Sequence, residues 1–292
     1  MSKADQPKKS LFRKIRKAHK AWKEGMRRRR ALRTLARFPR NSDGPRHSLP
    51  GELIISLTSY PARFPTLHLT IMSLLDQTVR PDRIVLWIAE EDAGQLPEAL
   101  KALQDDRFQI ETCEDLRSFK KILPSLAKFP DAFILIADDD TYYPEDWLRS
   151  LVEAYDPAEP AVVFTRGHRP RYTAEGSFMP YRQWDRNAVN EPDGTVSQDM
   201  LATGNGGVLY PPGSLPPETM DLDTIRRLSA TSDDVWLYFM RRRSGFPVRR
   251  VPGPRREYIE WEGTQAQALW FLHRTGKKDE HLQAMAEEFG LQ

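Results

Sequence analysis

Several common features are missing from this chain, and each absence narrows what it can be. Cys113 is the only cysteine, so no disulfide can form within the chain. No apolar run approaches the ~20 residues that span a bilayer, and the chain shows no apolar signal-peptide core. With 292 residues, of which 39% are hydrophobic, the chain is long enough for a large buried core. We therefore expect a cytoplasmic, globular protein.

The charge is unevenly distributed. Residues 1–46 hold 17 Lys and Arg against 3 Asp and Glu, whereas the remaining residues hold 27 against 38. The two parts therefore carry net charges of +14 and −11. We expect two different units, a basic arm over residues 1–46 and a globular body over residues 47–292.

The basic arm has the pattern of an amphipathic helix. Its apolar residues recur every three or four positions, between Lys and Arg: Leu11, Ile15, Ala18, Trp22 and Met26. An apolar stripe with a Trp, flanked by cations, suits the surface of an anionic membrane. A solvated helix is the plain alternative. RNA binding is disfavoured, because the body is acidic and has no RNA-binding aromatic signature. The turn-rich segment NSDGPRHSLPG then predicts a linker.

The body alternates predicted strands and helices. ELIISLTSY, DRIVLWIAEED, RFQIETC and AFILIA predict strands, while TLHLTIMSLLDQT and SFKKILPSLAKF, the latter interrupted by Pro124, predict helices between them. This order indicates an α/β fold with a mostly parallel central sheet. PEDWLRSLVEAY predicts a helix that begins at Pro144.

Asp138, Asp139 and Asp140 directly follow the fourth predicted strand. Helix capping explains one such residue, but three adjacent carboxylates repel each other and need a positive partner. Open α/β sheets bind ligands beyond the carboxyl ends of their strands, where these aspartates fall. We expect a divalent cation with oxygen ligands, Mg²⁺ or Mn²⁺, holding substrate phosphates.

From about Glu52 to Val248, the chain resembles bacterial family 2-like glycosyltransferases of the GT-A fold. Four motifs carry this resemblance in the order expected of the family: LIISLTSYPARFPTLHLTIMSLLDQTVRPDRIVLWI, ILIADDDTYYPEDWL, TGNGGVLYPP and SDDVWLYFMRRRSGFPV. The resemblance implies a single GT-A domain over residues 47–292 with a C-terminal helical segment. The short sequences TSYPAR, DLRSFKK and GGVLYPPGSL are similar to those of a subgroup that is associated with surface-polysaccharide assembly.

The resemblance implies a metal site in the acidic motif. The position of the helix-starting proline points to Asp139 as the ligand, with Asp138 facing the ribose, whereas an Asp-x-Asp spacing points to Asp138 and Asp140. We expect Asp139 to be the metal ligand, with Asp138 and Asp140 as further candidates. In the family, a third metal ligand is often a downstream histidine. The candidates here are His273 and His168, although lone histidines are usually structural or surface residues.

The resemblance also implies a donor site for a nucleotide sugar. Thr58, Ser59 and Tyr60 match the nucleotide-binding turn, and Arg63 lies close in sequence. The family's aspartate after the second strand is replaced here by Trp87-Ile88-Ala89, so Glu90 or Glu91 would substitute. Arg117, Lys120 and Lys121 are suited to bind a diphosphate, although a solvated basic helix face explains each equally well.

On the acceptor side, the resemblance makes Asp234 the general base and Asp233 its orienting neighbour, although capping explains one of them. Gly204, Gly206 and Gly207 permit close backbone approach, and Asn205 offers hydrogen bonds to a sugar; an ordinary turn is the alternative. The tryptophans that offer sugar-stacking faces are better explained as core residues: Trp184, Trp236 and Trp261.

The resulting hypothesis is a metal-dependent, inverting glycosyltransferase. It would move a sugar from a nucleotide sugar to a glycan or lipid-linked acceptor at the cytoplasmic face of the membrane. A sugar nucleotidyltransferase is one alternative, but TSYPARFP is not the glycine-rich basic loop that such enzymes usually need. A catalytically inactive scaffold at the membrane is the other, and the retained aspartates argue against it.

Overall fold

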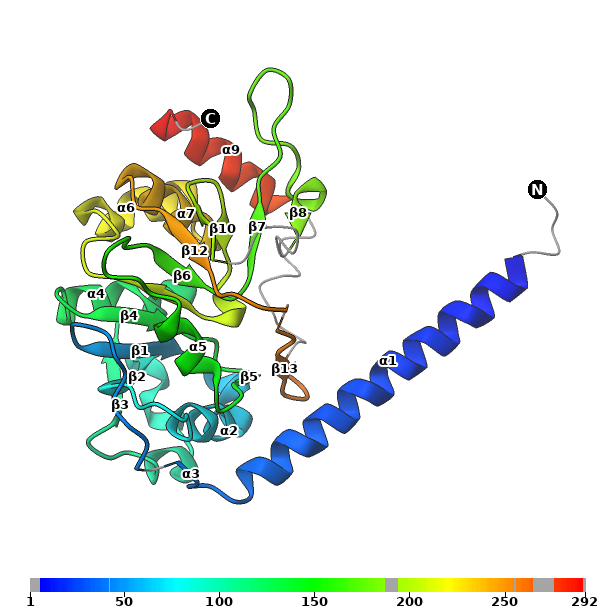
Figure 1. The fold of residues 1–292 in the computed structure, drawn as a ribbon, viewed down its shortest axis with the longest axis vertical. Coiled ribbons are helices and arrows are strands. Elements are labelled where there is room, and N and C mark those ends of the chain that lie inside the picture. Colours follow the sequence, from blue (N-terminus) through cyan, green and yellow to red (C-terminus); the bar gives the residue numbers. More distant parts are fainter. Residues whose placement is uncertain (1–5, 42, 187–193, 255, 265–275, 291–292) are drawn as a thin grey trace.

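An eight-stranded mixed sheet forms the centre of the body in the computed structural model (Figure 1). The structure describes residues 6–41, 43–186, 194–254, 256–264 and 276–290, with α1 side chains described from Arg16 onward. The strands follow the order β3-β2-β1-β4-β11-β6-β12-β9. No helix in the described ranges is both long and apolar enough to cross a membrane.

The first half of the sheet is the predicted parallel unit. β1 pairs in parallel with β2 and β4, and β2 pairs in parallel with β3. These strands are rich in branched aliphatic residues because helices cover both of their faces. The four predicted strands are confirmed as β1 (Leu53–Thr58), β2 (Arg83–Ala89), β3 (Phe108–Cys113) and β4 (Phe133–Ile136).

In the second half, two strands, β11 and β9, run opposite to the others. β11 (Val208–Tyr210) lies antiparallel between β4 and β6 (Val162–Phe164). β12 (Val248–Arg250) returns parallel to β6, and β9 (Val196–Ser197) closes the edge antiparallel to β12. The prediction of an α/β fold with a mostly parallel central sheet is therefore confirmed.

Alternate residues of the strands fill two cores, one on each face of the sheet. Ile54 and Val85 belong to the core that α4 and α7 cover, while Ile55 and Leu86 belong to the core under α2 and α5. Among the described residues, the α-helices of the body are α2 (Phe64–Leu75), α3 (Glu98–Lys101), α4 (Leu123–Lys128), α5 (Trp147–Glu153), α6 (Leu222–Leu228), α7 (Asp233–Arg243) and α9 (Lys277–Phe289).

Two predicted helices begin elsewhere. SFKKILPSLAKF divides into the 3₁₀ helix η4 (Arg117–Lys121) and α4, with Pro124 in the first turn of α4, where its missing N–H costs nothing. α5 begins at Trp147 rather than Pro144. The amide of Gln77 donates to the carbonyl of Pro144, and the Trp147 N–H donates to the same carbonyl, so this segment forms a turn before the helix.

Two small sheets lie beside the large one. β13 (Ile259–Glu260) pairs antiparallel with β5 (Thr141–Tyr142), which follows directly after Asp140. β7 (Gly167–Arg169) lies between β10 (Leu201–Ala202) and β8 (Asp185–Arg186). Both small sheets bring late segments of the chain to the carboxyl ends of the central strands.

The helix α1 (Gln6–Leu35) projects from the body, and only its last turns pack against it (Figure 1). Ala31 and Leu35 are buried against Trp261. After the helix, the backbone N–H groups of Arg40 and Asn41 donate to Asp76 at 2.7 and 2.9 Å. The end of the basic arm is therefore fixed to the body by buried apolar and polar contacts.

Candidate active site

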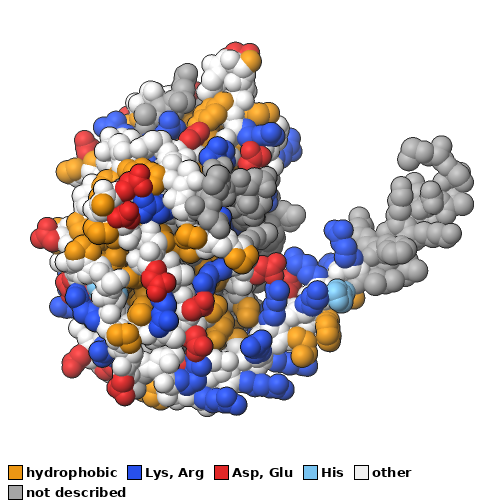
Figure 2. Space-filling model, viewed as in Figure 1, with side chains coloured by type: hydrophobic (Ala, Val, Ile, Leu, Met, Phe, Trp, Pro, Cys, Tyr) orange, Lys and Arg blue, Asp and Glu red, His pale blue; other side chains and the backbone are white. Residues whose placement is uncertain are grey.

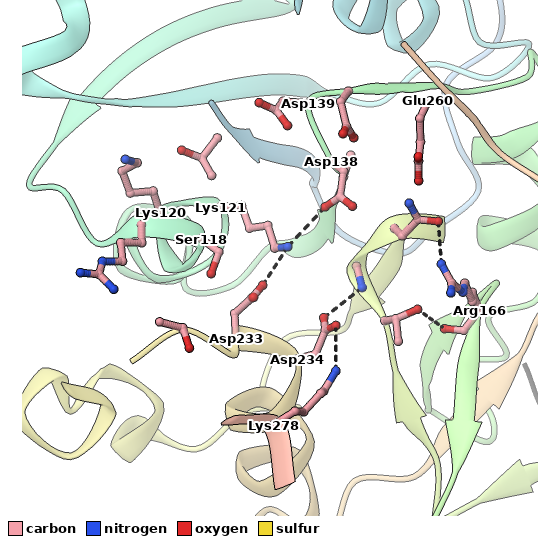
Figure 3. A pocket seen from close by; sticks show the side chains of 18 of the residues that line it. Ser118, Lys120, Lys121, Asp138, Asp139, Arg166, Asp233, Asp234, Glu260 and Lys278 are labelled. Carbon is pink, nitrogen blue, oxygen red and sulfur yellow. Dashed lines mark hydrogen bonds and ion pairs between the residues drawn. The ribbon is translucent and has the colours of Figure 1, made fainter. Parts of the chain in front are cut away.

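A cleft of about 1420 Å³ opens at the carboxyl ends of β1 and β4. It is lined by residues after these two strands, by η4, by the Gly204–Asn205 turn and by the start of α7 (Figure 3). Short segments of β7, β13 and α9 complete its walls. Nearly all the charged residues predicted to act together are present in this one cavity.

Asp139 is held by protein donors on both of its carboxylate oxygens. Ser59 Oγ donates to Oδ2 at 2.5 Å, and the Arg63 guanidinium binds Oδ1. Asp139 and Arg63 are both largely buried, and the same guanidinium lies 3.0 Å from Asp140 Oδ2. Arg63 is therefore a positive partner for two of the three aspartates, supplied by the loop after β1.

Asp138 faces a different cation, Lys121 of η4. The Lys121 ammonium lies 3.4 Å from Asp138 Oδ1 and 2.8 Å from Asp233 Oδ2, so it bridges the end of β4 to the start of α7 (Figure 3). Burial acts to lower the pKa of Lys121, but Asp233, Asp138 and Asp234 raise it well above its ordinary value. Lys121 is therefore a permanent charge between the two acidic groups.

Asp234 points into the cleft from the first turn of α7. Its Oδ1 accepts a hydrogen bond from the Gly204 N–H at 3.0 Å, and its Oδ2 lies 3.9 Å from the Lys278 ammonium. Burial and the charge of Asp233 raise the pKa of Asp234, whereas Lys121 outweighs burial and lowers the pKa of Asp233. The pKa values of the two adjacent carboxylates are thus shifted in opposite directions, and Asp234 is the better proton acceptor.

Of the glycine-rich segment TGNGGVLYPP, one part lines the cleft and another packs in the core. Gly204 and Asn205 line the cleft, and a Cβ on Gly204 would lie 2.8 Å from the Lys121 ammonium. Gly206 and Gly207 are not among the described lining residues. A Cβ on Gly207, whose φ is +93°, would lie 2.6 Å from the Trp147 ring, so this glycine is needed for packing.

The other predicted donor residues lie on the cleft with one exception. Thr58, Tyr60, Arg117 and Lys120 line it. Glu90 is exposed at the start of the 3₁₀ helix η3 (Glu90–Gln95), and neither it nor Glu91 is a lining residue within the described ranges, whereas Asp92 is. A three-residue turn points side chains two positions apart in different directions.

Of the two candidate histidines, His273 lies outside the described residues. His168 lines the cleft, but burial and the charges of Arg166, Lys278 and Arg186 lower its pKa to about 3. The three tryptophans are core residues, as expected, with exposed fractions of 1–3%. The indole N–H of Trp184 donates to Met179 O, that of Trp236 to Thr219 O, and that of Trp261 to Thr70 Oγ1.

Three cleft residues had no signal in the sequence. Glu260 arrives through the β13–β5 pairing, opposite Thr141, and burial and Asp138 raise its pKa. Arg166 donates to Asn205 Oδ1 at 3.0 Å, and Lys278, in the first turn of α9, lies beside Asp234. Two-residue strands and contacts between residues 39 or more positions apart leave no periodic pattern, so the sequence did not predict these three residues.

The residues present suit a hard divalent cation. Among the described residues, no three acidic, histidine or cysteine side chains are gathered into a ready-made metal site. Mg²⁺ and Mn²⁺ need only one or two carboxylates when a diphosphate supplies further oxygens. Asp139 shares both oxygens with protein donors, and Asp140 has Arg63 3.0 Å from Oδ2 and accepts from Thr141 Oγ1 on Oδ1. Asp138 is the most exposed of the three and is therefore the best-placed ligand, with Asp140 as its partner in the Asp-x-Asp spacing.

No protein-family model matches the chain, and no curated protein matches its sequence. Solved structures with a similar fold include 4-diphosphocytidyl-2C-methyl-D-erythritol synthase from Anaerococcus prevotii, at 15% identity and TM-score 0.47, covering 77% of this chain and 96% of that one. An inositol-1-phosphate CTP transferase from T. maritima has 13% identity and TM-score 0.43, covering 82% and 98%. A mannosyltransferase from Pyrobaculum calidifontis, in complex with GDP-Man and Mn²⁺, has 14% identity and TM-score 0.48, covering 88% and 70%. At such low identity, neither the reactions nor the residues of those enzymes transfer to this chain.

Proposed function

We propose that this protein is a metal-dependent, inverting glycosyltransferase. The observation that carries the proposal is the position of Lys121, which lies between Asp138 on one side of the cleft and Asp233 on the other. Asp234, next to Asp233, has a raised pKa and faces the same cavity. One site thus holds carboxylates for a cation and a separate carboxylate suited to accept a proton.

On the donor side, Asp138 and Asp140 would hold Mn²⁺ or Mg²⁺, which supplies a Lewis acid for the diphosphate leaving group. Arg117, Lys120 and Lys121 line the same side and add positive charge for the phosphate oxygens. Asp139 anchors this side by joining Ser59 to Arg63. Thr58 and Tyr60 line the same cleft and would contact the nucleotide.

On the acceptor side, Asp234 takes the proton of the attacking hydroxyl. The Gly204 N–H holds the orientation of Asp234, and Asn205 offers hydrogen bonds to the acceptor sugar. Because a single base on the face opposite the diphosphate serves a direct displacement, the product has inverted configuration. Asp233, paired with Lys121, stays ionised and fixes the start of α7.

The basic arm supports an acceptor at a membrane, such as a lipid-linked glycan in surface-polysaccharide assembly. Lys and Arg side chains gather along α1 (Figure 2). The side chains of Trp22 and Met26 on this helix are exposed at 63% and 45%. At 3.6 residues per turn, Ala31 lies half a turn away from Trp22, so the helix packs on the body by one face and exposes the other. An exposed apolar face among cations matches an anionic leaflet.

A sugar nucleotidyltransferase is a weaker candidate. The loop after β1 contains no glycine, and its arginine, Arg63, is bound to Asp139 and Asp140. This loop is therefore not arranged as a backbone cradle for a triphosphate. No described contact favours an inactive scaffold.

A thermal-stability screen of nucleotides and nucleotide sugars, with and without Mn²⁺, tests the proposed function. A ligand at 100 times its Kd adds about 2.7 kcal/mol to the apparent stability. We expect a nucleoside diphosphate or its sugar conjugate to raise Tm only when Mn²⁺ is present. Stabilisation by a nucleoside triphosphate with a sugar 1-phosphate, and by no nucleotide sugar, would instead favour the nucleotidyltransferase.

A further inference from the structure

The wall of the cleft beside Asp234 carries a group of cations that the proposed chemistry does not use. We name Arg182, Arg186 and Lys278 the cationic rim. They come from the 3₁₀ helix η5 (Tyr181–Gln183), from β8 and from the first turn of α9, and all three line the same cavity as Asp234. Two parts of the chain that are distant in the sequence, η5 with β8 and the start of α9, thus bring positive charge to one place.

Lys278 is buried, with 6% of its surface exposed, yet its ammonium makes only loose contacts. It lies 3.9 Å from Asp234 Oδ2 and 4.2 Å from the centre of the Tyr181 ring. Within the described ranges, Lys278 donates no hydrogen bond. A buried ammonium normally needs close acceptors, so its position facing the cleft indicates that a ligand supplies them.

Arg182 and Arg186 are exposed, and neither forms an ion pair with a residue that the structure describes. The acidic residues nearby have other partners. Asp185 lies 3.6 Å from Arg171, and Asp279 accepts a hydrogen bond from the Tyr181 N–H at 2.6 Å. Planar guanidinium groups of this kind bind phosphates and carboxylates through paired hydrogen bonds.

The pKa of His168 is lowered in part by the same excess of positive charge. Burial is the main cause of its lowered pKa, and Arg166, Lys278 and Arg186 each lower it further. At neutral pH the ring is therefore uncharged, and it adds a hydrogen-bonding group rather than another cation. Arg166 is engaged with Asn205, so it belongs to the central part of the cleft.

We propose that the acceptor carries a negatively charged group, a phosphate or a carboxylate, which binds to the cationic rim. Lys278 contacts the base Asp234, whereas the donor carboxylate Asp138 lies on the other side of Lys121, so the anionic group enters with the attacking hydroxyl rather than with the nucleotide. This inference rests on the proposed function for the direction of transfer. The binding of an anionic sugar is a property of the rim itself.

NMR titrations with glucose 6-phosphate, glucuronic acid and glucose test the inference. EDTA is present to disable metal-assisted binding on the donor side, and the ionic strength is held constant so that screening is equal throughout. We expect an anionic sugar to bind the full-length protein at least about tenfold more tightly than glucose. Comparison of the first two probes shows whether phosphate or carboxylate is preferred, and inorganic phosphate shows whether the sugar contributes.

Three variants locate the binding. Arg182→Gln with Arg186→Gln, and separately Lys278→Gln, should each reduce the preference for the charged sugar by about three- to tenfold. Arg149→Gln removes an exposed arginine on α5 outside the cleft and should change nothing. Unchanged Tm values would show that the variants are folded.

Equal affinity for charged and neutral sugars, or equal loss in the Arg149→Gln control, would overturn the inference. The same variants are also titrated with a nucleoside diphosphate and Mn²⁺. If that binding is intact while the anionic sugars fail to bind, the rim proposal is wrong and the proposed function stands. If the nucleotide fails and the anionic sugars bind, the proposed function is wrong and the rim is an anion site of a different enzyme.

Discussion

At the scale of single residues, neighbours in sequence have different surroundings. Asp138 is partly exposed to the cleft, while Asp139 is buried between Ser59 and Arg63. The acidic motif therefore combines an accessible carboxylate with one that stabilises the fold. Substituting Asp139 should therefore affect stability, whereas substituting Asp138 should affect ligand binding.

Asp139→Ala should destabilise the protein, because among the described residues it leaves the buried Arg63 guanidinium with Asp140 as its one remaining carboxylate partner. Breaking a buried ion pair in this way costs ~3–5 kcal/mol. Asp138→Ala should leave the free energy of unfolding within ~1 kcal/mol of the wild type, yet lose Mn²⁺-dependent nucleotide binding. Urea unfolding and calorimetry measure the two effects, and equal stability of the two variants would contradict this assignment.

Asp234→Asn should bind the nucleotide donor normally but lose turnover. The amide keeps the size of the side chain and can still accept the Gly204 N–H, but it cannot take a proton at neutral pH. Loss of a positioned base lowers kcat by ~10²–10⁴-fold. The matched control is Asp233→Asn; if that variant loses turnover and Asp234→Asn does not, the base is Asp233.

At the scale of elements, the segment after α1 is fixed to the body by Asp82. Burial acts to raise the pKa of Asp82, but hydrogen bonds from Arg46, His47 and the Leu53 N–H outweigh it and hold the pKa well below its ordinary value. The stability contributed by Asp82 is complete above the unfolded-state pKa, near 3.8, and is lost as the pH falls toward the folded-state pKa.

Asp82→Asn should therefore lower the free energy of unfolding by ~1–3 kcal/mol at pH 7. At pH 3 the difference from the wild type should be smaller, because part of the wild-type contribution is then lost as well. Urea unfolding at both pH values measures this change. A difference that grows as the pH falls would show that the carboxylate is not stabilised as its contacts indicate.

The elements that the sequence predicted correctly are those with long patterns. β1 and β2 are continuous apolar runs buried on both faces, and α2, predicted from TLHLTIMSLLDQT, is a helix of 12 residues between them. The segments that complete the cleft are β13, a two-residue strand, and the first turn of α9. Their positions depend on tertiary pairing, so neither Glu260 nor Lys278 was predicted. Arg63 was predicted near the donor, but its bonds to Asp139 and Asp140 were not.

At the scale of the whole molecule, the basic arm does not end where the charge pattern ends. Ala31, Leu35 and Arg40 pack on or bind to the body, so deleting residues 1–46 would also remove structural contacts. A deletion of residues 1–26 removes the exposed stretch with Trp22 and Met26 and leaves those contacts in place. This shorter deletion is the appropriate test of membrane binding.

The chain without residues 1–26 should stay in the supernatant when anionic vesicles are sedimented, while the full-length protein pellets with them. Trp22→Ala with Met26→Ala should weaken vesicle binding by at least about tenfold, since each side chain would bury apolar surface in the interface. Salt should weaken it too, because screening acts within about 8–10 Å at ~0.1–0.15 M ionic strength. Equal pelleting of the full-length and shortened proteins would contradict a membrane role.

The most direct test of the whole account is the identity of the nucleotide released. Incubating the protein with Mn²⁺ and the nucleotide sugar that stabilises it, with and without a membrane extract as a source of acceptors, should release a nucleoside diphosphate. The extract should raise the rate, and Asp234→Asn should abolish the release. Release of pyrophosphate from a nucleoside triphosphate and a sugar 1-phosphate would contradict the account, as would diphosphate release that persists unchanged in Asp234→Asn.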